Sequence, residues 1–472
     1  MNYDYDLITI GLGPAGMAVS VMGSAMGLKV CAIEKNKIGG ECMNVGCIPS
    51  KSLLRMAKAR AMFDKLANME LESMPKPGVK APFKRIGGYI QFINDQKTRR
   101  MFDQVDLVLG QGSASFLDSH TVAVGDKQYT ARKIFIATGT EPMVPPIPGI
   151  EGIDILTNLN IFNLEKIPES VTIIGGGAIG SEMAQALTRL GAKCTIVQMD
   201  PYLVPVGDPE AGALLEEVFR KEGITVHNQK KITRLVKESD GVALYTEDGI
   251  VVRSQRFLVA AGRRIVLEGL GLEQAGVVYG KRGIVVNSHL QTNQKHIFAV
   301  GDCNGHFLLT HAAMHQGMIA LMNSMMPWPF KMKFQKFAVP WTVFTEPQNS
   351  HVGLREKDLK ERGLRYEVVK VKYEDYGAAI AEDIGTGFLK AFISPTGRIY
   401  GVTIIGEGSG EMINEWALAI QKKARITDIM MLQHSFPTMG FLTKRVSEVW
   451  MMNKMKSRFL QNICRSCFRI FP

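Results

Sequence analysis

Two glycine-rich turns, each between an apolar strand and a helix, constrain the fold of this chain most strongly. The first turn spans residues 11–16 (GLGPAG), follows an expected strand over 7–10 and opens a helix expected to end near Met26. Glycines in this pattern allow a tight turn and let a pyrophosphate approach the N-terminus of the helix. A second expected strand over 29–33 leads to Glu34, whose carboxylate can accept a hydrogen bond from a ribose hydroxyl. This order of elements predicts a dinucleotide-binding fold.

The second turn spans residues 175–180 (GGGAIG) and follows an expected strand over 171–174. A further strand over 194–197 leads to Gln198, at the position that the acid holds in the first unit. An amide can still hydrogen-bond a ribose hydroxyl, although more weakly than a carboxylate does. No lysine or arginine lies between Gln198 and Asp208 to pair with a 2′-phosphate, so the sequence favours NADH over NADPH.

Two nucleotide sites in one polypeptide suit a flavin and a nicotinamide that exchange a hydride. Small residues follow three further apolar strands, at 137–140, 260–263 and 299–302, and would let the chain pass close to such cofactors. From about residue 334 the pattern changes to strands that alternate with helices, which is typical of a separate α+β domain. The expected fold class is α/β, with two Rossmann-like nucleotide-binding domains, for FAD and NAD(P), and a C-terminal α+β domain.

The cysteines point to redox chemistry. Seven cysteines in 472 residues are too few and too scattered for a secreted disulfide scaffold. Cys42 and Cys47 lie five residues apart at the expected start of one helix, where they can close a small disulfide. The helix N-terminus and nearby Lys51 both favour a thiolate at the more buried cysteine. A zinc site would need two further ligands, and no second close pair lies nearby in sequence, so no metal site is predicted.

With the stretch GGECMNVGCIPSK at 39–51, the chain resembles the pyridine nucleotide–disulfide oxidoreductases, the group that contains dihydrolipoamide dehydrogenase, glutathione reductase and mercuric reductase. The resemblance extends to about Arg445 and implies a two-fold homodimer, in which the partner's C-terminal domain completes each active site. It implies that Cys47 faces the flavin and that Cys42 exchanges with the substrate. It also implies an ion pair between Lys51 and Glu182 beside the flavin.

The resemblance implies a division into domains and a set of site residues. The predicted domains are the FAD-binding domain at 1–149, the NAD(P)-binding domain at 150–268, a return segment of the FAD domain at 269–335, the dimerisation domain at 336–445 and a basic amphipathic tail at 446–472. The predicted catalytic residues are Cys42, Cys47, Lys51 and Glu182. The predicted FAD site comprises Gly11, Gly13, Gly16, Glu34, Lys35, Gly40, Lys51, Ala114, Thr138, Gly139, Asp302 and His311. The predicted NAD site comprises Gly175, Gly177, Ile179, Gly180, Glu182, Gln198, Gly262 and Arg263.

The chain departs from this family in its C-terminal domain. Disulfide-reducing members carry a His-Pro-Thr motif followed by Glu as their acid–base catalyst, whereas alignment on Pro437-Thr438 places Phe436 and Phe441 at those positions. Neither ring can transfer a proton, and loss of a positioned acid–base typically costs about 10²- to 10⁴-fold in rate. Two residues upstream, His434 is either a replacement catalyst or a structural histidine. A second departure is Glu41, since several members have threonine there, near the FAD phosphates.

The electron acceptor therefore stays open between two classes. One is a small-molecule or protein disulfide, as in dihydrolipoamide dehydrogenase. The other is an acceptor that needs no protonating histidine, such as a mercuric or other soft metal ion or a quinone. Mercuric reductases also carry an aromatic residue, tyrosine, at the position of Phe436, which favours the second class.

The net charge of +11 is concentrated at the C-terminus, because the chain from Lys444 onward contains seven basic residues and only one acid, Glu448. Four apolar residues of this tail fall three or four apart and predict one basic amphipathic helix: Met452, Met455, Phe459 and Ile463. Such a helix would lie in solvent with its charges hydrated, pack on the dimer core, or contact an anionic membrane surface or an acidic protein. Nucleic acid is not a predicted partner. The tail cysteines Cys464 and Cys467 are either an electron or metal relay or two free thiols.

The N-terminus runs directly into a strand pattern without a basic and then apolar leader, and no apolar run is long enough to span a bilayer. A cytoplasmic location is expected, with peripheral contact at the inner face of a membrane as an alternative. A third function class follows from the tail, namely a flavoprotein subunit docked to a membrane or complex. The intact set of Cys42, Cys47, Lys51 and Glu182 argues against a purely non-catalytic role.

Overall fold

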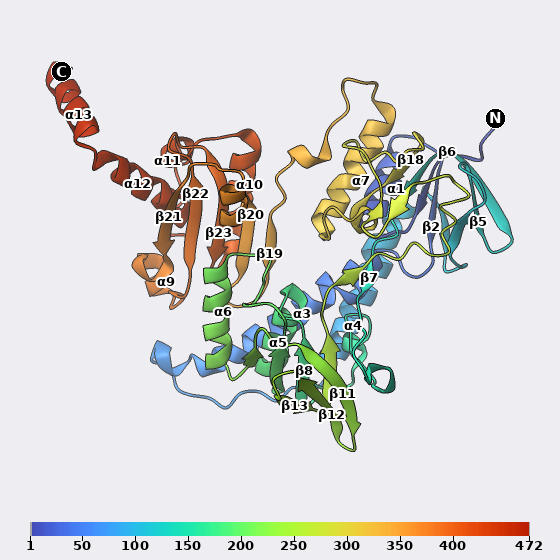
Figure 1. The fold of residues 1–472 in the computed structure, drawn as a ribbon, viewed down its shortest axis with the longest axis horizontal. Helices are drawn as coiled ribbons and strands as arrows, with labels where there is room; N and C mark the ends of the chain where they lie inside the picture. The colour runs from blue at the N-terminus through green and yellow to red at the C-terminus, as the bar shows by residue number, and fades with distance from the viewer. Residues whose placement is uncertain (1, 472) are drawn as a thin grey trace. The chain divides into compact units, whose positions relative to one another are not determined.

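The computed structural model describes residues 2–471, and the chain divides into two compact units (Figure 1). The first unit comprises the residues up to 199 together with Glu222–Gln335. The second comprises Asp200–Lys221 and the residues from Lys336 to the C-terminus. The chain therefore leaves the first unit once, for a single helical segment, before it returns and finally crosses to the second.

A mostly parallel sheet forms the centre of the first nucleotide-binding fold, with strand order β3-β2-β1-β6-β5-β4 and β18 beside β6. Its strands are β1 (Tyr5–Ile10), β2 (Val30–Glu34), β3 (Asp106–Leu109), β4 (Ala114–Phe116), β5 (Thr121–Val124), β6 (Lys127–Ile136) and β18 (Ile297–Ala299). Ile8 pairs with Cys31 on one side and with Ile134 on the other, and all three are fully buried. Continuous apolar burial of this kind is typical of a parallel sheet covered on both faces.

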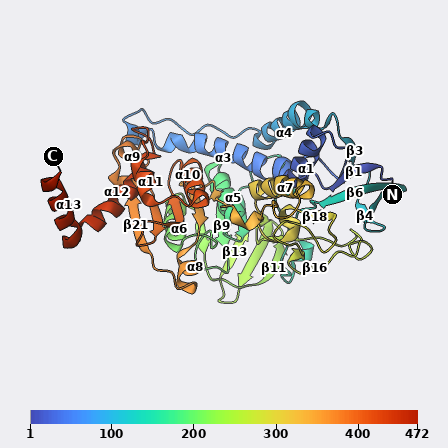
Figure 2. The ribbon, with the colours of Figure 1, turned by 90° about the horizontal axis from the view of Figure 1, so that it is seen from above.

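Helices cover this sheet and carry the residues of interest. Helices α1 (Pro14–Ala25) and α7 (Thr310–Met325) lie side by side although they are far apart in sequence (Figures 1 and 2). A Cβ on Gly317 of α7 would lie 2.4 Å from the carbonyl oxygen of Ala15, so glycine permits this close packing. The other helices of this part are α2 (Gly40–Val45), α3 (Cys47–Ala61) and α4 (Pro82–Ile93).

The second nucleotide-binding fold has a parallel sheet with strand order β10-β9-β8-β14. Its elements are β8 (Ser170–Ile174), α5 (Ala178–Arg189), β9 (Lys193–Val197), β10 (Thr225–His227) and β14 (Arg256–Val259). An antiparallel sheet of β11 (Ile232–Glu238), β12 (Gly241–Thr246) and β13 (Val251–Ser254) accompanies it. Two short strand pairs complete the unit: β7 (Glu141–Pro142) with β15 (Arg263–Arg264), and β16 (Tyr279–Gly280) with β17 (Gly283–Ile284).

The second unit is built on a five-stranded antiparallel sheet in the order β19-β20-β23-β22-β21. Its strands are β19 (Trp341–Val343), β20 (Asn349–Gly353), β21 (Glu367–Lys372), β22 (Phe388–Ile393) and β23 (Ile399–Ile405). Its helices are α6 (Pro209–Lys221), α8 (Glu356–Glu361), α9 (Gly377–Ala381), α10 (Ser409–Lys422), α11 (Ile426–Met431), α12 (Phe441–Met455) and α13 (Arg458–Ile470). Trp416 and Tyr373 are fully buried in its core. Parallel nucleotide-binding sheets and a C-terminal antiparallel sheet confirm the predicted fold class.

An ion-pair cluster that the sequence analysis missed holds α6 to the second unit. Lys390 lies in the middle of β22 and is 4% exposed. Its ammonium is 2.8 Å from Asp208 and 2.7 Å from Glu210, at the start of α6. Because a charge buried without a partner is costly, this pairing explains why α6 belongs to the second unit although it follows β9 in sequence.

The prediction of one continuous tail helix is wrong. Helix α12 ends at Met455 and α13 begins at Arg458, because Ser457 adopts an extended conformation with φ −71° and ψ 122°. The predicted domain boundary at 445/446 falls inside α12, whose Val446 and Trp450 are buried in the core of the second unit. The predicted apolar stripe is therefore divided between two helices with different surroundings.

Candidate active site

In the first glycine turn, Gly11 and Gly16 pack tightly against backbone atoms, whereas Gly13 borders open space. A Cβ on Gly11, whose φ is +92°, would lie 2.5 Å from the carbonyl oxygen of Ala137. A Cβ on Gly16 would lie 1.9 Å from the Gly11 oxygen, which no side chain could tolerate. A Cβ on Gly13 would meet no protein atom within 4 Å. The turn thus leaves free space beside the N-terminus of α1, which fits a bound dinucleotide pyrophosphate.

The second turn repeats this arrangement. Gly175 has φ +103°, and a Cβ there would lie 2.5 Å from the carbonyl oxygen of Ala260. A Cβ on Gly180 would lie 1.9 Å from the Gly175 oxygen, whereas one on Gly177 would again meet nothing within 4 Å. This turn at the start of α5 therefore fits a second dinucleotide by the same backbone geometry.

The polar residues after the second strands occupy equivalent places but differ in charge. The Glu34 carboxylate accepts the backbone N–H of Leu12 at 2.8 Å. The Gln198 amide oxygen accepts the backbone N–H of Gly176 at 3.0 Å, and its amide nitrogen donates to Asn228 Oδ1 at 2.6 Å. Each side chain therefore fixes its glycine turn, while only the first brings a negative charge to the site.

The cysteine pair lies across a break between two helices, so the prediction of a single helix start is wrong. Cys42 belongs to α2 and Cys47 is the first residue of α3. Gly46 separates them, with φ −129° and ψ −110°, and a Cβ at Gly46 would lie 2.9 Å from the Glu41 carbonyl oxygen. The break turns the two thiols toward each other, and the structure holds them as free cysteines.

The two thiols are electrostatically unequal. A hydrogen bond from Cys42 lowers the pKa of Cys47 to about 6, helped by the Thr310 hydroxyl and the charge of Lys51 and opposed by burial. The same hydrogen bond, together with burial, raises the pKa of Cys42. Thr310 Oγ1 lies 3.4 Å from Cys47 Sγ. Thr310 is not among the site residues predicted from the sequence, although it directly precedes the predicted His311. In the reduced pair Cys47 is the thiolate and Cys42 the thiol.

An ion pair joins α3, the helix that begins at Cys47, to α5, the helix that follows the second glycine turn. Lys51 Nζ on α3 lies 2.7 Å from Glu182 Oε2 on α5. The Glu182 side chain is only 6% exposed and that of Lys51 is 36% exposed. Lys51 is one turn after Cys47 on α3, so the geometry brings three of the predicted catalytic residues together.

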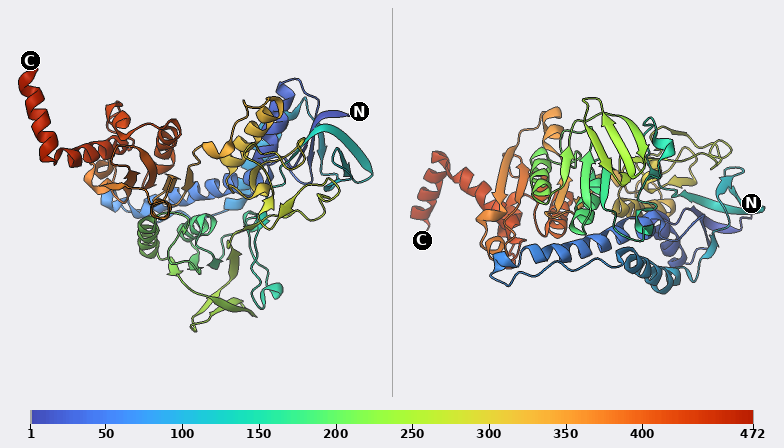
Figure 3. Two further views of the ribbon diagram at one scale, coloured as in Figure 1. Left: turned by 45° about the horizontal axis from the view of Figure 1, so that its top comes forward. Right: turned by 90° about the horizontal axis from the view of Figure 1, so that it is seen from below.

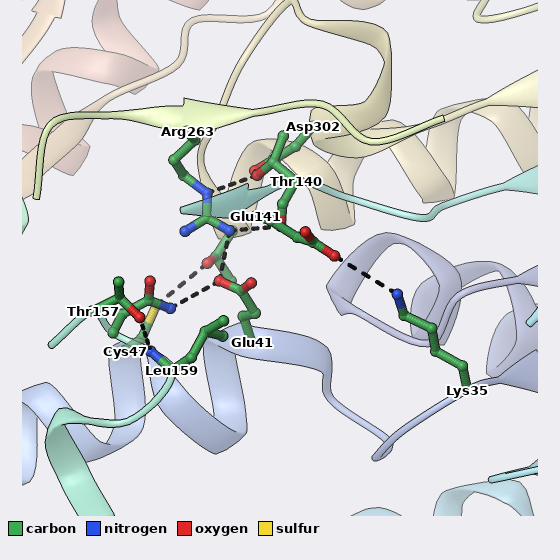
Figure 4. A network of polar contacts seen from close by, with 11 residues as sticks. Lys35, Glu41, Cys47, Thr140, Glu141, Thr157, Leu159, Arg263 and Asp302 are labelled. Atoms are coloured by element: carbon green, nitrogen blue, oxygen red, sulfur yellow. Dashed lines mark hydrogen bonds and ion pairs between the residues drawn. The ribbon is translucent and has the colours of Figure 1, made fainter. Parts of the chain in front are cut away.

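A polar network ties the cysteine helix α2 to other loops of the first unit (Figure 4). Arg263 lies 2.6 Å from the Glu41 carboxylate, which also accepts a 2.9 Å hydrogen bond from Asn158. The Arg263 Nε donates to Thr140 Oγ1 at 2.7 Å, and that hydroxyl donates to Asp302 at 3.1 Å. Burial raises the pKa of Asp302, while the Thr140 hydrogen bond and Arg263 oppose the rise. Glu41 and Arg263 are thus partners, although the sequence analysis assigned Arg263 to the nicotinamide nucleotide.

The remaining predicted residues lie at several places in the first unit. Lys35 is 3.7 Å from Glu141 (Figure 4). Ala114 is buried in β4, and Ile179 at the start of α5 is 39% exposed. His311 is the exposed second residue of α7. The others lie in loops or at a helix start: Gly40, Thr138, Gly139 and Gly262.

In the second unit, the two phenylalanines at the family's acid–base positions contact each other. The rings of Phe436 and Phe441 meet edge to face, with centroids 5.4 Å apart, and Phe436 is 71% exposed. His434 Nε2 lies 3.0 Å from Glu415 Oε1, and the His434 side chain is 7% exposed. The unit therefore carries an apolar pair, with Phe436 exposed and Phe441 partly buried, at the positions that the resemblance assigns to an acid–base, and a separate pair of His434 with Glu415.

Comparison with known families accounts for most of the chain. The family described as pyridine nucleotide-disulphide oxidoreductase matches residues 5–317. The dimerisation domain of the same family matches residues 339–445.

Individual relatives include enzymes with two different substrates. A dihydrolipoyl dehydrogenase of Thermus scotoductus is 34% identical over 452 residues, which cover 92% of this chain and 95% of that protein. A mercuric reductase of Bacillus cereus is 29% identical over 445 residues, which cover 93% of this chain and 70% of that protein.

Solved structures that superpose on the chain include a flavoprotein disulfide reductase. The HOCl-induced flavoprotein disulfide reductase RclA from Escherichia coli superposes with a TM-score of 0.84 at 25% identity, covering 94% of this chain and 99% of that one. Its Cu(II) complex superposes with a TM-score of 0.85, covering 95% and 100%. The chain therefore belongs to the pyridine nucleotide–disulphide oxidoreductases, FAD- and NAD(P)-dependent flavoproteins with a redox-active disulfide and a dimerisation domain.

Proposed function

We propose that this flavoprotein passes electrons from NADH through FAD to the Cys42–Cys47 disulfide and then to a thiophilic metal ion. Bound FAD supplies the chemistry that converts a hydride from the nicotinamide into an electron pair for the disulfide. The observation that carries the choice of acceptor is the contact of Phe436 with Phe441, 5.4 Å between ring centroids, at the positions of the family's acid–base pair. We further propose a homodimer of the kind that the dimerisation domain supports.

The stoichiometry of protons separates the two acceptor classes. Reduction of a disulfide gives two thiols, so each leaving thiolate needs a proton, and a positioned acid accelerates that step. A metal ion that accepts electrons from a dithiol needs no proton. Phenylalanines at positions 436 and 441 thus impair the first reaction while leaving the second unaffected.

The reduced cysteine pair suits a soft metal ion. Thiolates select soft and borderline metals, and the low pKa of Cys47, about 6, keeps that sulfur deprotonated at neutral pH. Cys42 holds its proton, because its hydrogen bond to Cys47 and burial raise its pKa, and it would lose that proton when a metal ion binds. The names of two relatives agree with this chemistry, since one is a mercuric reductase and one solved structure is a Cu(II) complex.

The preference for NADH rests on the second nucleotide site. Gln198 occupies the ribose position, and no basic side chain follows it before Asp208 to bind a 2′-phosphate.

A second candidate acceptor is a disulfide, and one observation favours it. His434 and Glu415 form a 3.0 Å pair of the kind that orients and stabilises a catalytic histidine. If this pair replaced the missing acid–base, lipoamide or glutathione disulfide would be the substrate.

An acceptor panel at fixed NADH separates the candidates. The panel contains Hg²⁺, Cu²⁺, lipoamide, glutathione disulfide and a quinone. We expect turnover with a metal ion that is abolished in Cys42→Ser and Cys47→Ser, and slow turnover of both disulfides that His434→Ala leaves unchanged. The double variant Cys464→Ser/Cys467→Ser is the control for metal held by the exposed tail thiols. Fast lipoamide turnover that His434→Ala removes would instead establish the disulfide reaction, and turnover of quinone alone would reject both.

A further inference from the structure

The last helix of the chain is exposed on all sides. No residue of α13 (Arg458–Ile470) is buried, whereas α12 (Phe441–Met455) packs into the core of its unit through Leu442, Val446 and Trp450. In Figures 1 and 3 α13 continues from α12 at the red end of the chain, beyond the sheet of its unit. The change at Ser457 therefore separates a helix that stabilises the fold from one that contributes little to it.

One face of α13 is apolar. A rotation of about 100° per residue places Phe459, Ile463 and Ile470 within about 40° of one another. Leu460 and Cys467 extend this face on one side. Phe459 is 71% exposed, Ile463 43% and Ile470 70%, and the adjoining Phe471 is 69% exposed. Aromatic and aliphatic side chains exposed together in this way mark an interaction surface.

A second face of α13 is basic. The same rotation places Arg458, Arg465 and Arg469 within about 40° of one another, and the centre of this face lies about 120° from that of Phe459, Ile463 and Ile470. The sequence contains no acidic residue after Glu448, so nothing in the tail itself neutralises these arginines. Guanidinium groups bind phosphate oxygens in a bidentate manner, so this face suits phosphate-bearing surfaces.

We propose that α13 docks this flavoprotein on the surface of a bilayer that contains anionic lipid. The helix would lie in the interface, with its apolar face among the acyl chains and its arginines at the headgroups. A second copy of the chain could cover the apolar face but would leave the arginines without anionic partners. An acidic protein could bind the arginines but would leave the apolar face in water. An anionic lipid interface satisfies both faces at once.

The docking is peripheral. Within residues 2–471, no helix combines the length and the apolarity that a membrane crossing requires. Reversible binding by one short helix depends on both contributions, so removal of either face should release the protein. Screening predicts weaker binding at high ionic strength, because the Debye length falls from about 10 Å at 0.1 M salt to about 3 Å at 1 M.

The test is co-sedimentation of the FAD-loaded, full-length protein with vesicles of phosphatidylcholine alone or of phosphatidylcholine with phosphatidylglycerol. We expect binding only to the vesicles that contain phosphatidylglycerol. Each arginine near the surface contributes about fivefold in affinity, so R458Q/R465Q/R469Q should bind about 100-fold more weakly. The matched control K281Q/R282Q/K295Q removes the same charge from exposed positions of the first unit and should bind like the unaltered protein.

A second variant tests the apolar face. F459S/I463S keeps every charge, replaces two exposed side chains and should also abolish vesicle binding, with an unchanged flavin spectrum and melting temperature. Equal loss in the matched control would overturn the proposal, because it would indicate general charge attraction. Binding to neutral vesicles alone would overturn it as well. A lower mass of F459S/I463S in light scattering without lipid would overturn it in favour of contact between copies of the chain.

Discussion

The glycine turn at 11–16 and the glycine turn at 175–180 can be compared atom by atom. In each, the first glycine approaches a carbonyl oxygen of a neighbouring strand end so closely that a Cβ would lie 2.5 Å from it. In each, a Cβ on the last glycine would lie 1.9 Å from the first glycine's oxygen. The polar side chain that fixes the turn is the Glu34 carboxylate in one and the neutral Gln198 amide in the other. Backbone geometry is therefore common to both turns, and the charge of the side chain that fixes each turn distinguishes them.

A second difference lies in what packs on each turn. A Cβ on Gly40 would lie 2.9 Å from the Gly13 Cα, so the start of the cysteine helix α2 lies directly against the first turn. The second turn has no cysteine segment, but its helix α5 supplies Glu182, which reaches Lys51 at 2.7 Å. The cysteine pair is thus attached to the first nucleotide-binding fold, and the second fold supplies one carboxylate that pairs with Lys51.

The largest expected effects come from closing either turn. Gly16→Ala and Gly180→Ala each place a Cβ 1.9 Å from a backbone oxygen, and overpacking of this kind costs about 3 kcal/mol or more where the neighbour cannot move. We expect purified Gly16→Ala to lack flavin. We expect Gly180→Ala to keep flavin but not to bleach on addition of NADH. The flavin spectrum before and after NADH measures both.

The open glycines provide the matched control. Gly13→Ala and Gly177→Ala meet no protein atom within 4 Å, so both variants should fold with an unchanged melting temperature. Each should weaken only the nucleotide that its own turn binds. Loss of flavin from Gly177→Ala would contradict the assignment of the two sites.

The next largest effect is expected from breaking the ion pair of Lys51 with Glu182, which joins the two nucleotide-binding folds of the chain. Lys51→Met removes a charge that lowers the pKa of Cys47, so that pKa should rise from about 6 toward 9.0, the ordinary value of a cysteine. Titration of the ultraviolet thiolate absorbance of the reduced protein measures it. A thiol whose pKa is lowered in the folded state stabilises the fold. That contribution is complete at pH values above the ordinary pKa and is lost as the pH falls toward 6. The reduced protein should therefore gain stability between pH 6 and 9, and Lys51→Met should gain less. An unchanged titration in Lys51→Met would show that the hydrogen bonds from Cys42 and Thr310 lower the pKa of Cys47 without the charge of Lys51.

The comparison also shows what the sequence could predict. Local patterns specified both glycine turns, because strand, turn and helix lie within about 30 residues of each other and backbone sterics allow few alternatives. The strands expected over 171–174 and 194–197 lie at Ser170–Ile174 and Lys193–Val197, each one residue longer at its start. The fold class and the family were confirmed.

Features that depend on distant residues could not be predicted. Lys390 is separated from Asp208 by more than 180 positions, and nothing local indicates that this lysine is buried and paired. The pairing of Arg263 with Glu41, the proximity of Thr310 to Cys47 and that of His434 to Glu415 are likewise contacts between segments far apart or on different elements. The break at Ser457 was missed because the apolar spacing continues across it.

A smaller effect is expected from exchanging the residue that distinguishes the two turns. Gln198→Glu replaces a neutral hydrogen bond to a ribose hydroxyl with a charge-assisted one. The charge-assisted bond is stronger by about 1 kcal/mol, which corresponds to about fivefold in affinity. We expect kcat/KM to rise about fivefold for NADH and to fall for NADPH, whose 2′-phosphate the new charge repels. The reciprocal Glu34→Gln should weaken FAD binding by a similar factor. Equal effects on NADH and NADPH in Gln198→Glu would mean that this side chain does not face the ribose.

The smallest expected effect concerns the first residue of α1 and of α5, the helices that follow the two glycine turns. α1 begins with Pro14 and α5 with Ala178, although the residues before them, Gly13 and Gly177, have nearly the same backbone angles, φ −66° and −73° with ψ −177° and −166°. Proline suits the first helical position and the extended residue that precedes it. Ala178→Pro should therefore stabilise the protein by about 0.4–1 kcal/mol, or about 0.6–1.5 °C in Tm for a unit of this size, and Pro14→Ala should destabilise it equally, because proline restricts the unfolded chain. Thermal unfolding followed by circular dichroism measures both variants. A fall in Tm for Ala178→Pro would mean that the second turn needs the backbone N–H of residue 178. The first turn has no such group, because Pro14 lacks an N–H, so the two turns would then differ in backbone as well as in charge.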